Sequence, residues 1–255
     1  MKNVAHSPLP HPKTPQLPLD VGLRDGFSFA SFVPGANQVL LDGLLTQARG
    51  QGELQMYLYG EAASGKTHLA QAMCHQAGLF GAVAACLDAE LLLTVGTEAL
   101  DGLDTLDVVC VDDLHQLCGE HRWEVALYNL INATRASGTR LVMTGRHGPH
   151  DLRCLLADLR SRILWGPVFQ LHELSEQEKR GLLMERANRR GLHLAEDACD
   201  YLLRHCQRDL ASLIELLNQL DHASLAAKRR LTVPFIREVL ATSSLVLADT
   251  AKTAK

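Results

Sequence analysis

The sequence predicts an α/β fold in which a five-stranded parallel sheet flanked by helices is followed by a small all-helical lid domain. Short apolar runs alternate with helical segments from residue 27 to residue 172, a pattern typical of parallel sheets. After residue 172 the strand signals stop and only helical patterns follow. We therefore expect an α/β domain at 27–172, a lid domain at 173–242, and flexible or disordered tails at 1–26 and 243–255.

Five apolar runs predict the strands of the sheet, because each is bounded by polar or turn-forming residues. The predicted strands are 54–59, 83–87, 107–111, 139–144 and 168–171. The helices expected between them are 37–48, 66–77, 121–136 and 151–159.

Capping signals predict the helices of the C-terminal domain. Ser175 and Glu178 have the spacing of a capping box, which opens a helix that ends near Arg190, where Gly191 follows. The remaining helices are expected at 196–205, at 209–227 with Asp209 as N-cap, and at 233–241 with Thr232 as N-cap.

The composition is that of an ordinary globular protein without a basic field. Of 255 residues, 47% are hydrophobic, the net charge is −4 and the pI is about 6.3, so overall charge does not attract nucleic acid. The seven cysteines form no CxxC pair and lie mostly in apolar runs, as expected of reduced cytosolic thiols. No secretory signal or membrane-spanning run is evident, so we expect a cytoplasmic protein with no membrane partner.

A complete phosphate-binding loop, GEAASGKT, occupies residues 60–67 between a predicted strand and a predicted helix. In such a loop, backbone N–H groups and the helix N-terminus bind phosphates, Lys66 reaches the outer phosphates, and the Thr67 hydroxyl ligates magnesium. A chance glycine turn before a helix is the alternative. The nucleotide-binding residues expected here are Gly60, Ala62, Ala63, Ser64, Gly65, Lys66, Thr67 and His68.

The run VVCVDD, ending at Asp113, supplies the acidic group that a phosphate loop requires on a neighbouring strand. Asp112 is expected at the carboxyl end of its strand, where ligands of parallel sheets gather, and would hold magnesium together with Thr67. Asp113 either orients an attacking water or caps a turn.

Three further segments extend these motifs into a family resemblance. They are FASFVPGANQ at 29–38, DLRSRILWGPVFQL at 158–171, and LNQLDHASLAAKRRLTVPFIREVL at 217–240. With the loop and the acidic strand, they resemble the AAA+ family of the replication initiator DnaA and its relative Hda, over about residues 16 to 241. The resemblance implies ADP or ATP with Mg²⁺ as cofactors. It also implies that the segment containing Phe32, Val33 and Asn37 lies against the adenine.

The resemblance assigns further roles to single residues. Arg162 matches the family's arginine finger, which acts in trans on ATP held by a neighbouring subunit; otherwise it is an exposed helix-end residue interacting with the helix dipole. Thr144 matches the first sensor, or is a strand-end threonine with a local backbone bond. Ala211 stands where the family carries a lid arginine, which weakens the expectation of efficient hydrolysis by this chain.

The N-terminal segment QLPLDV, residues 16–21, resembles the motif by which bacterial replication proteins bind the DNA polymerase III sliding clamp (beta subunit). The residues that would bind the clamp are Gln16, Leu17, Leu19 and Val21. A proline-rich linker with scattered leucines is the alternative.

The resemblance thus implies a negative regulator of replication initiation that docks on the DNA-loaded clamp and promotes hydrolysis of DnaA-bound ATP. Its partners would be the clamp, DnaA, DNA indirectly through the clamp, and a second copy in a homo-oligomer. Too few residues follow Ala241 for a helix-turn-helix domain, so autonomous origin recognition is not expected. The alternatives are a self-sufficient AAA+ ATPase acting as a loader or remodelling factor, and a nucleotide-gated scaffold.

Overall fold

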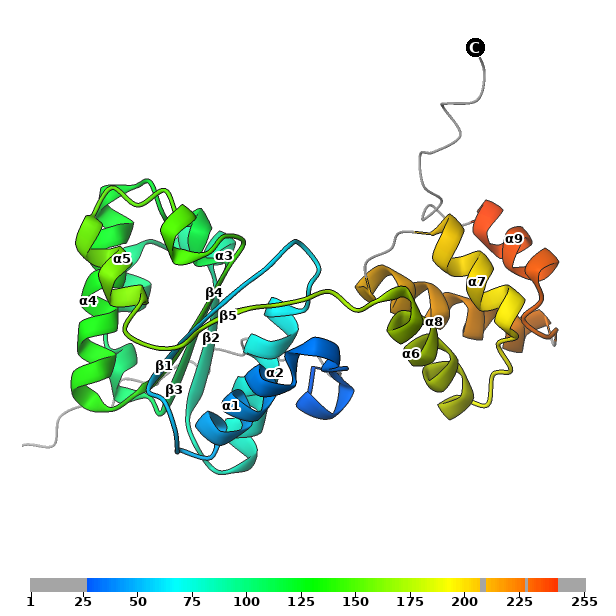
Figure 1. Cartoon of the computed structure of the whole chain (residues 1–255), viewed down its shortest axis with the longest axis horizontal. Helices are drawn as coiled ribbons and strands as arrows, with labels where there is room; N and C mark the ends of the chain where they lie inside the picture. Colours follow the sequence, from blue (N-terminus) through cyan, green and yellow to red (C-terminus); the bar gives the residue numbers. More distant parts are fainter. Residues whose placement is uncertain (1–26, 207–209, 228, 243–255) are drawn as a thin grey trace, which may run out of the picture.

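The computed structural model describes residues 27–206, 210–227 and 229–242, and within them five parallel strands form one sheet in the order β2-β3-β4-β1-β5 (Figure 1). All predicted strands are present, with ends within one residue of the prediction, so the predicted fold class is confirmed. The strands are β1 (Gln55–Tyr59), β2 (Ala84–Asp88), β3 (Val108–Asp112), β4 (Arg140–Gly145) and β5 (Val168–Gln170).

Helices cover both faces of the sheet and continue after its last strand. The α-helices are α1 (Gln38–Ala48), α2 (Lys66–Leu79), α3 (Ala89–Val95), α4 (His121–Ser137), α5 (Ala157–Ile163), α6 (Glu176–Arg189), α7 (Glu196–His205), α8 (Leu210–Ala227) and α9 (Val233–Thr242). The 3-10 turns are η1 (Phe29–Ser31), η2 (Gly35–Asn37), η3 (Thr97–Leu100), η4 (Leu103–Thr105), η5 (Leu114–Gln116) and η6 (Pro149–Asp151).

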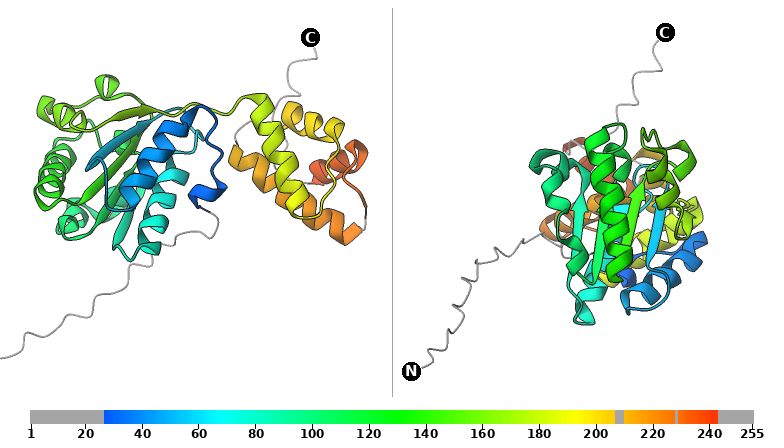
Figure 2. Two further views of the ribbon diagram at one scale, coloured as in Figure 1. Left: turned by 60° about the horizontal axis from the view of Figure 1, so that its bottom comes forward. Right: turned by 90° about the vertical axis from the view of Figure 1, so that its left-hand side faces the viewer.

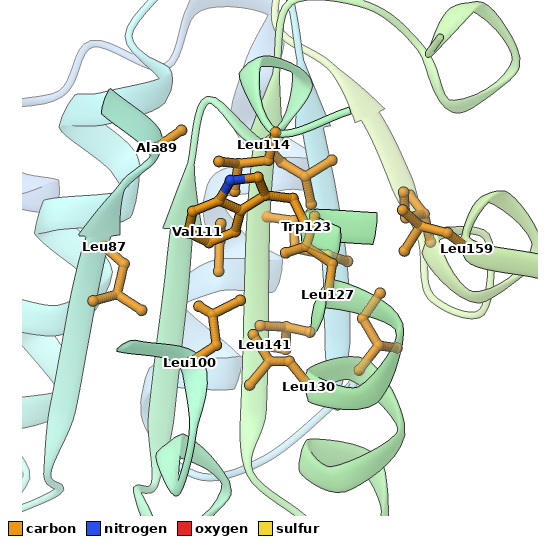
Figure 3. Packing of buried hydrophobic residues seen from close by; sticks show 14 of the residues in the cluster. Leu87, Ala89, Leu100, Val111, Leu114, Trp123, Leu127, Leu130, Leu141 and Leu159 are labelled. Atoms are coloured by element: carbon orange, nitrogen blue, oxygen red, sulfur yellow. The ribbon is translucent and has the colours of Figure 1, made fainter. Parts of the chain in front are cut away.

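Alternation along β1 separates two hydrophobic cores. Met56 and Leu58 point into the core that includes residues of α1 and α2, whereas Tyr57 points into the core that includes residues of α4 and α5. Trp123 lies at the centre of the second core and is completely buried, against the sheet residue Val111 (Figure 3). The phosphate loop and its neighbouring strands are therefore supported from both sides.

The helix expected at 151–159 was wrong in its bounds, because α5 begins only at Ala157. The carboxylate of Glu124, which is fully buried at the start of α4, accepts the backbone N–H groups of Leu155 and Leu156 at 2.9 and 2.6 Å. These N–H groups are thus held by a residue distant in sequence, and Leu156 has an extended backbone. The prediction also missed α3, whose N-cap Asp88 accepts the N–H of Glu90.

Helices α6 to α9 form a group of their own beyond β5 (Figure 2). Their apolar side chains form a third core, drawn from residues 183–240. The predicted capping box is confirmed, since Ser175 and Glu178 each accept a backbone N–H of the other, and Gly191 follows α6 with a φ of 72°. These ranges support the domain division that we propose at residue 172. Over the described ranges, no helix is long and apolar enough to cross a membrane.

Four sequence-based expectations fall outside the described residues: the tail at 1–26, the clamp-binding segment 16–21 within it, the cap at Asp209, and the tail at 243–255.

Candidate functional site

The phosphate loop follows β1 at the carboxyl edge of the sheet and leads directly into α2. Ala63 and Gly65 have positive φ angles of 60° and 102°, which turn the chain so that Lys66 begins the helix. A side chain at Gly60 would bring a Cβ within 2.9 Å of the carbonyl oxygen of Leu171, the residue after β5, so the close approach of the chain there requires glycine at position 60.

Lys66 lies inside the curve of this loop. Its Nζ donates to the carbonyl oxygens of Gly60 and Glu61 at 2.9 and 2.7 Å, and only 7% of the residue is exposed. Burial lowers the pKa of Lys66, an effect that the carboxylates of Asp113 and Asp112 oppose. A cation is thus held where the motif requires one for binding phosphates.

Asp112, at the end of β3, connects the helix α2 with the strand β4. It accepts hydrogen bonds from the hydroxyl groups of Thr144, at 2.5 Å, and Thr67. Only 4% of Asp112 is exposed, and burial raises the pKa of its carboxyl, whereas the two hydroxyls act in the opposite direction. Carboxylate and hydroxyl oxygens are ligands that Mg²⁺ prefers, so the donor set of Asp112 and Thr67 fits this ion.

Asp113 has a left-handed backbone, with φ 54° and ψ 39°, and begins η5. Its side chain caps nothing but lies 3.7 Å from Nδ1 of His115 and is about one-third exposed. Its backbone N–H donates to Thr144 Oγ1, which fixes the turn next to Asp112. The carboxylate of Asp113 therefore remains accessible beside Asp112, the candidate magnesium ligand.

The segment before α1 packs on the first turn of α2. The Phe32 and Phe27 rings lie 5.7 and 5.1 Å from the ring of His68, and Phe32 lies against Gly65. His68 Nε2 shares hydrogen bonds with Ser28 O and Ser31 Oγ, and burial lowers its pKa. Phe32 and His68 thus lie next to the loop, and their contact with a nucleotide stays a prediction.

Asn37 and Val33 are placed differently. The Asn37 amide is used on both sides by the backbone of His172, since Nδ2 donates to its carbonyl at 2.9 Å and Oδ1 accepts its N–H at 2.8 Å. Asn37 therefore joins the segment before α1 to the residues between β5 and α6. Val33 is half-buried within the same segment.

Arg162 lies away from this site, in the last turn of α5. Gln55 Nε2 donates to the carbonyl oxygens of Arg162 and Ile163 at 2.8 and 3.0 Å, which ties the end of α5 to the beginning of β1. Since Gly60 follows the other end of β1, roughly 16 Å of strand separates the two points at about 3.3 Å per residue. The structure does not bring Arg162 together with the phosphate loop of its own chain.

The side chain of Arg162 is half-buried and bound, unlike the exposed helix-end residue of the alternative interpretation. Its Cζ lies 3.9 Å from the centroid of the Trp165 ring, and Nη2 donates to Tyr128 Oη at 3.1 Å. Arg160, two residues earlier, is also half-buried and donates to the Leu152 carbonyl. Trp165 is at the surface, 37% exposed.

Three residues that shape these sites were not predicted from the sequence. Arg186 of α6 donates to the Ser31 carbonyl at 2.9 Å and so links the C-terminal helices to the segment that contains Phe32. Glu124 positions the start of α5, and Gln55 positions its end. A charged residue on the apolar face of a helix is the one sequence signal that would have singled out Glu124.

The arrangement separates the candidate nucleotide-binding residues from the arginine at the end of α5. The first set lies at the carboxyl edge of the sheet, with Lys66, Thr67, Asp112 and Thr144 in contact with one another or with the loop. The second lies at the opposite end of β1, where Arg162 is stacked at the surface.

Comparison with known proteins agrees with the fold. Residues 176–240 match the family model of the Hda lid domain. Domain III of the replication initiation protein DnaA from Thermotoga maritima has a similar structure, with a TM-score of 0.73 and 19% identity over 86% of this chain and 97% of that one.

Two other solved structures are also similar. AMPPCP-bound DnaA from Aquifex aeolicus gives a TM-score of 0.66 and 22% identity over 81% of this chain and 69% of that chain. The RuvB Holliday junction branch migration motor of Thermotoga maritima gives 0.60 and 17% identity over 81% and 67%. These identities show a shared fold. The chain therefore joins a segment that matches the Hda lid domain to a fold that it shares with DnaA and RuvB.

Proposed function

We propose that this protein is a negative regulator of replication initiation that supplies Arg162 to ATP held by DnaA. A single observation carries the proposal: Gln55 holds the end of α5 at the opposite end of β1 from the phosphate loop. An arginine so far from its own nucleotide site, yet half-exposed beside an aromatic ring, has the position expected of a group that acts on another subunit. The Hda lid domain and the fold shared with DnaA support a role in replication.

In this mechanism the chemistry takes place on the partner. The guanidinium would stabilise the charge that develops on the transferring phosphoryl group, while this chain's own Gly60–Thr67 loop and Asp112 bind ADP or ATP with Mg²⁺ and organise the molecule. Residues Gln16 to Val21 would dock on the sliding clamp, which brings the protein to DNA indirectly. As a replication factor it would act in the cytoplasm.

The test measures hydrolysis of ATP bound to DnaA in the presence of this protein and clamp loaded on DNA. Arg162→Ala should lower the stimulated rate by about 10³-fold or more, the range measured for arginine fingers elsewhere. Arg160→Ala, two residues away on α5, is the matched control and should retain stimulation. Undiminished activity of Arg162→Ala would overturn the proposal.

Docking is tested separately with Gln16→Ala. This change should weaken stimulation when the clamp is limiting, and saturating clamp should restore it, because the chemistry at Arg162 is untouched. If stimulation never depends on clamp, the docking part of the proposal fails and the arginine part stands.

A second function is favoured by the contacts that join Lys66, Thr67, Asp112 and Thr144 around one loop. This set is what a self-contained ATPase, a loader or remodelling factor, would use. That function predicts rapid ATP turnover by the purified protein alone, lost in Lys66→Met. Ala211, at the place of the family's lid arginine, argues against it.

A further inference from the structure

Two arginines share the ring of Trp165 at the surface. The Arg162 Cζ lies 3.9 Å from the ring centroid, and the Arg135 Cζ, from the last turn of α4, lies 4.6 Å from the same centroid. Neither guanidinium forms an ion pair within the ranges that the structure describes. The ring therefore attracts two uncompensated positive charges at the end of α5.

Stacking on an aromatic face orients a guanidinium without using its donors. The ring attracts the flat face of the cation, whereas the N–H groups of arginine point outward in its plane. In Arg162 one of these groups, on Nη2, donates to Tyr128 Oη. The guanidinium is thus held by the Trp165 ring and by Tyr128, whose ring centroid also lies 5.2 Å from Cζ. Its Nε is buried, so the N–H groups left for an anion are those of the two terminal nitrogens.

The backbone beneath this stack is equally constrained. Gln55 holds the carbonyl oxygens of Arg162 and Ile163, and the N–H of Trp165 donates to the carbonyl of Arg162 at 3.1 Å. A Cβ at Gly166 would lie 2.0 Å from the Gln55 carbonyl oxygen, so the chain passes too close to β1 for any other residue. The Trp165 ring and the Arg162 guanidinium therefore both extend from one short turn that Gln55 holds in place.

We propose that Trp165 is a positioning residue for Arg162, whose ring holds the guanidinium flat at the surface with its N–H edge turned to a phosphate offered by a partner. Arg135 shares the ring, limits the other orientations open to Arg162 and adds a second positive charge that attracts the phosphate. This inference rests on the proposed function of Arg162, and it adds Trp165 and Arg135 to the residues on which stimulated hydrolysis depends.

Removing the ring should lower the maximal rate of stimulated hydrolysis more than it weakens docking. Trp165→Ala should lose about 2- to 30-fold in that rate, the range that a cation–π contact supports. Trp165→Phe should recover part of the loss because it retains an aromatic face, whereas Trp165→Leu, which is apolar without such a face, should not. Phe80→Ala removes another half-exposed aromatic, beyond α2 on the other face of the sheet, and should have no effect.

Rates that are equal in wild type, Trp165→Ala and Trp165→Leu would overturn the proposal, provided that Arg162→Ala has lost stimulation. If Arg162→Ala retains full stimulation, the proposed function itself fails. Equal losses in Trp165→Phe and Trp165→Leu would also overturn the proposal for Trp165, because they would show that the packing of the side chain matters and its π face does not.

Tryptophan fluorescence of the unaltered protein gives a readout that needs no variant. The chain has two tryptophans, and Trp123 is completely buried, so iodide should quench only the emission of Trp165. Docking of ATP-bound, clamp-associated DnaA should protect this emission from iodide, and DnaA without nucleotide should protect it less. Equal quenching with and without the ATP-bound partner would contradict a place for Trp165 beside the phosphate.

Discussion

Thr144 on β4 donates its hydroxyl hydrogen to Asp112 at the end of β3, with 2.5 Å between Oγ1 and Oδ1, and the same hydroxyl oxygen accepts the backbone N–H of Asp113. One small side chain thereby positions both acids of the predicted site. Thr67, from the first turn of α2, also bonds to Asp112. The carboxylate at the centre of these contacts is buried, and this leads to the first prediction.

Asp112→Asn should stabilise the protein in the absence of nucleotide and remove its response to magnesium. Because burial raises the pKa of Asp112, its contribution to stability is fully present below the usual aspartate pKa of about 4 and is lost as the pH rises through the folded value. At neutral pH the uncharged amide avoids the cost of burying a negative charge, so the melting temperature should rise by about 2–4 °C. Differential scanning calorimetry with and without magnesium nucleotide measures both effects.

Asp113→Asn is the matched control, since Asp113 is partly exposed and bonds to Thr144 only through its backbone. It should leave the melting temperature almost unchanged. The stability gain of Asp112→Asn should also disappear near pH 3, where the wild-type carboxyl is protonated. A gain that persists there would contradict the assignment of the effect to a buried charge.

Lys66→Met should weaken nucleotide binding by about 10- to 150-fold, the loss expected for one charged hydrogen-bonding group. The reason is that Lys66 is the buried cation inside the curve of the loop. Isothermal titration with ADP and Mg²⁺ measures the change. Lys179→Met removes a lysine of similar burial in α6, which pairs with Glu173 and Glu176, and the nucleotide affinity of this variant should match the wild type.

Glu124→Gln should destabilise the protein by about 2–3 kcal/mol, because a charged acceptor of three backbone N–H groups is replaced by a group that carries its own donor. The three donors are Gly119, Leu155 and Leu156. Urea unfolding measures the loss, and hydrogen exchange should locate increased opening at residues 152–157. Glu120→Gln, at an exposed neighbouring position, should have no comparable effect.

Arg186→Ala should weaken nucleotide binding by about 2- to 12-fold, which corresponds to one hydrogen bond. Its guanidinium donates to the Ser31 carbonyl next to Phe32. Burial lowers the pKa of Arg186, and Arg190 and Arg189 add to this effect, whereas Glu185 opposes it. Hydrogen exchange of residues 28–37 should increase. Arg189→Ala, which removes an exposed arginine of the same helix, is the control; equal effects of the two changes would refute a specific link through Ser31.

The predicted strands, the phosphate loop and the capping box of α6 needed no tertiary information. Each is determined by neighbours in the chain: apolar runs of strand length, glycine at Gly60 and Gly65, and the spacing of Ser175 and Glu178. The clustering of Lys66, Thr67 and Asp112 followed from the rule that carboxyl ends of parallel strands share one edge.

Contacts between residues far apart in the sequence decided the rest. Residues 151–156 have a helical pattern, yet the buried carboxylate of Glu124 accepts hydrogen bonds from two of their N–H groups. The helix α5 therefore begins only at Ala157. A family resemblance singled out Arg162, but its distance from the chain's own loop depends on one amide, Gln55, at the opposite end of β1. Local patterns thus determined which elements form, and only the tertiary structure decided that Arg162 lies away from the phosphate loop of its own chain, because that depends on which end of β1 its helix is bound to.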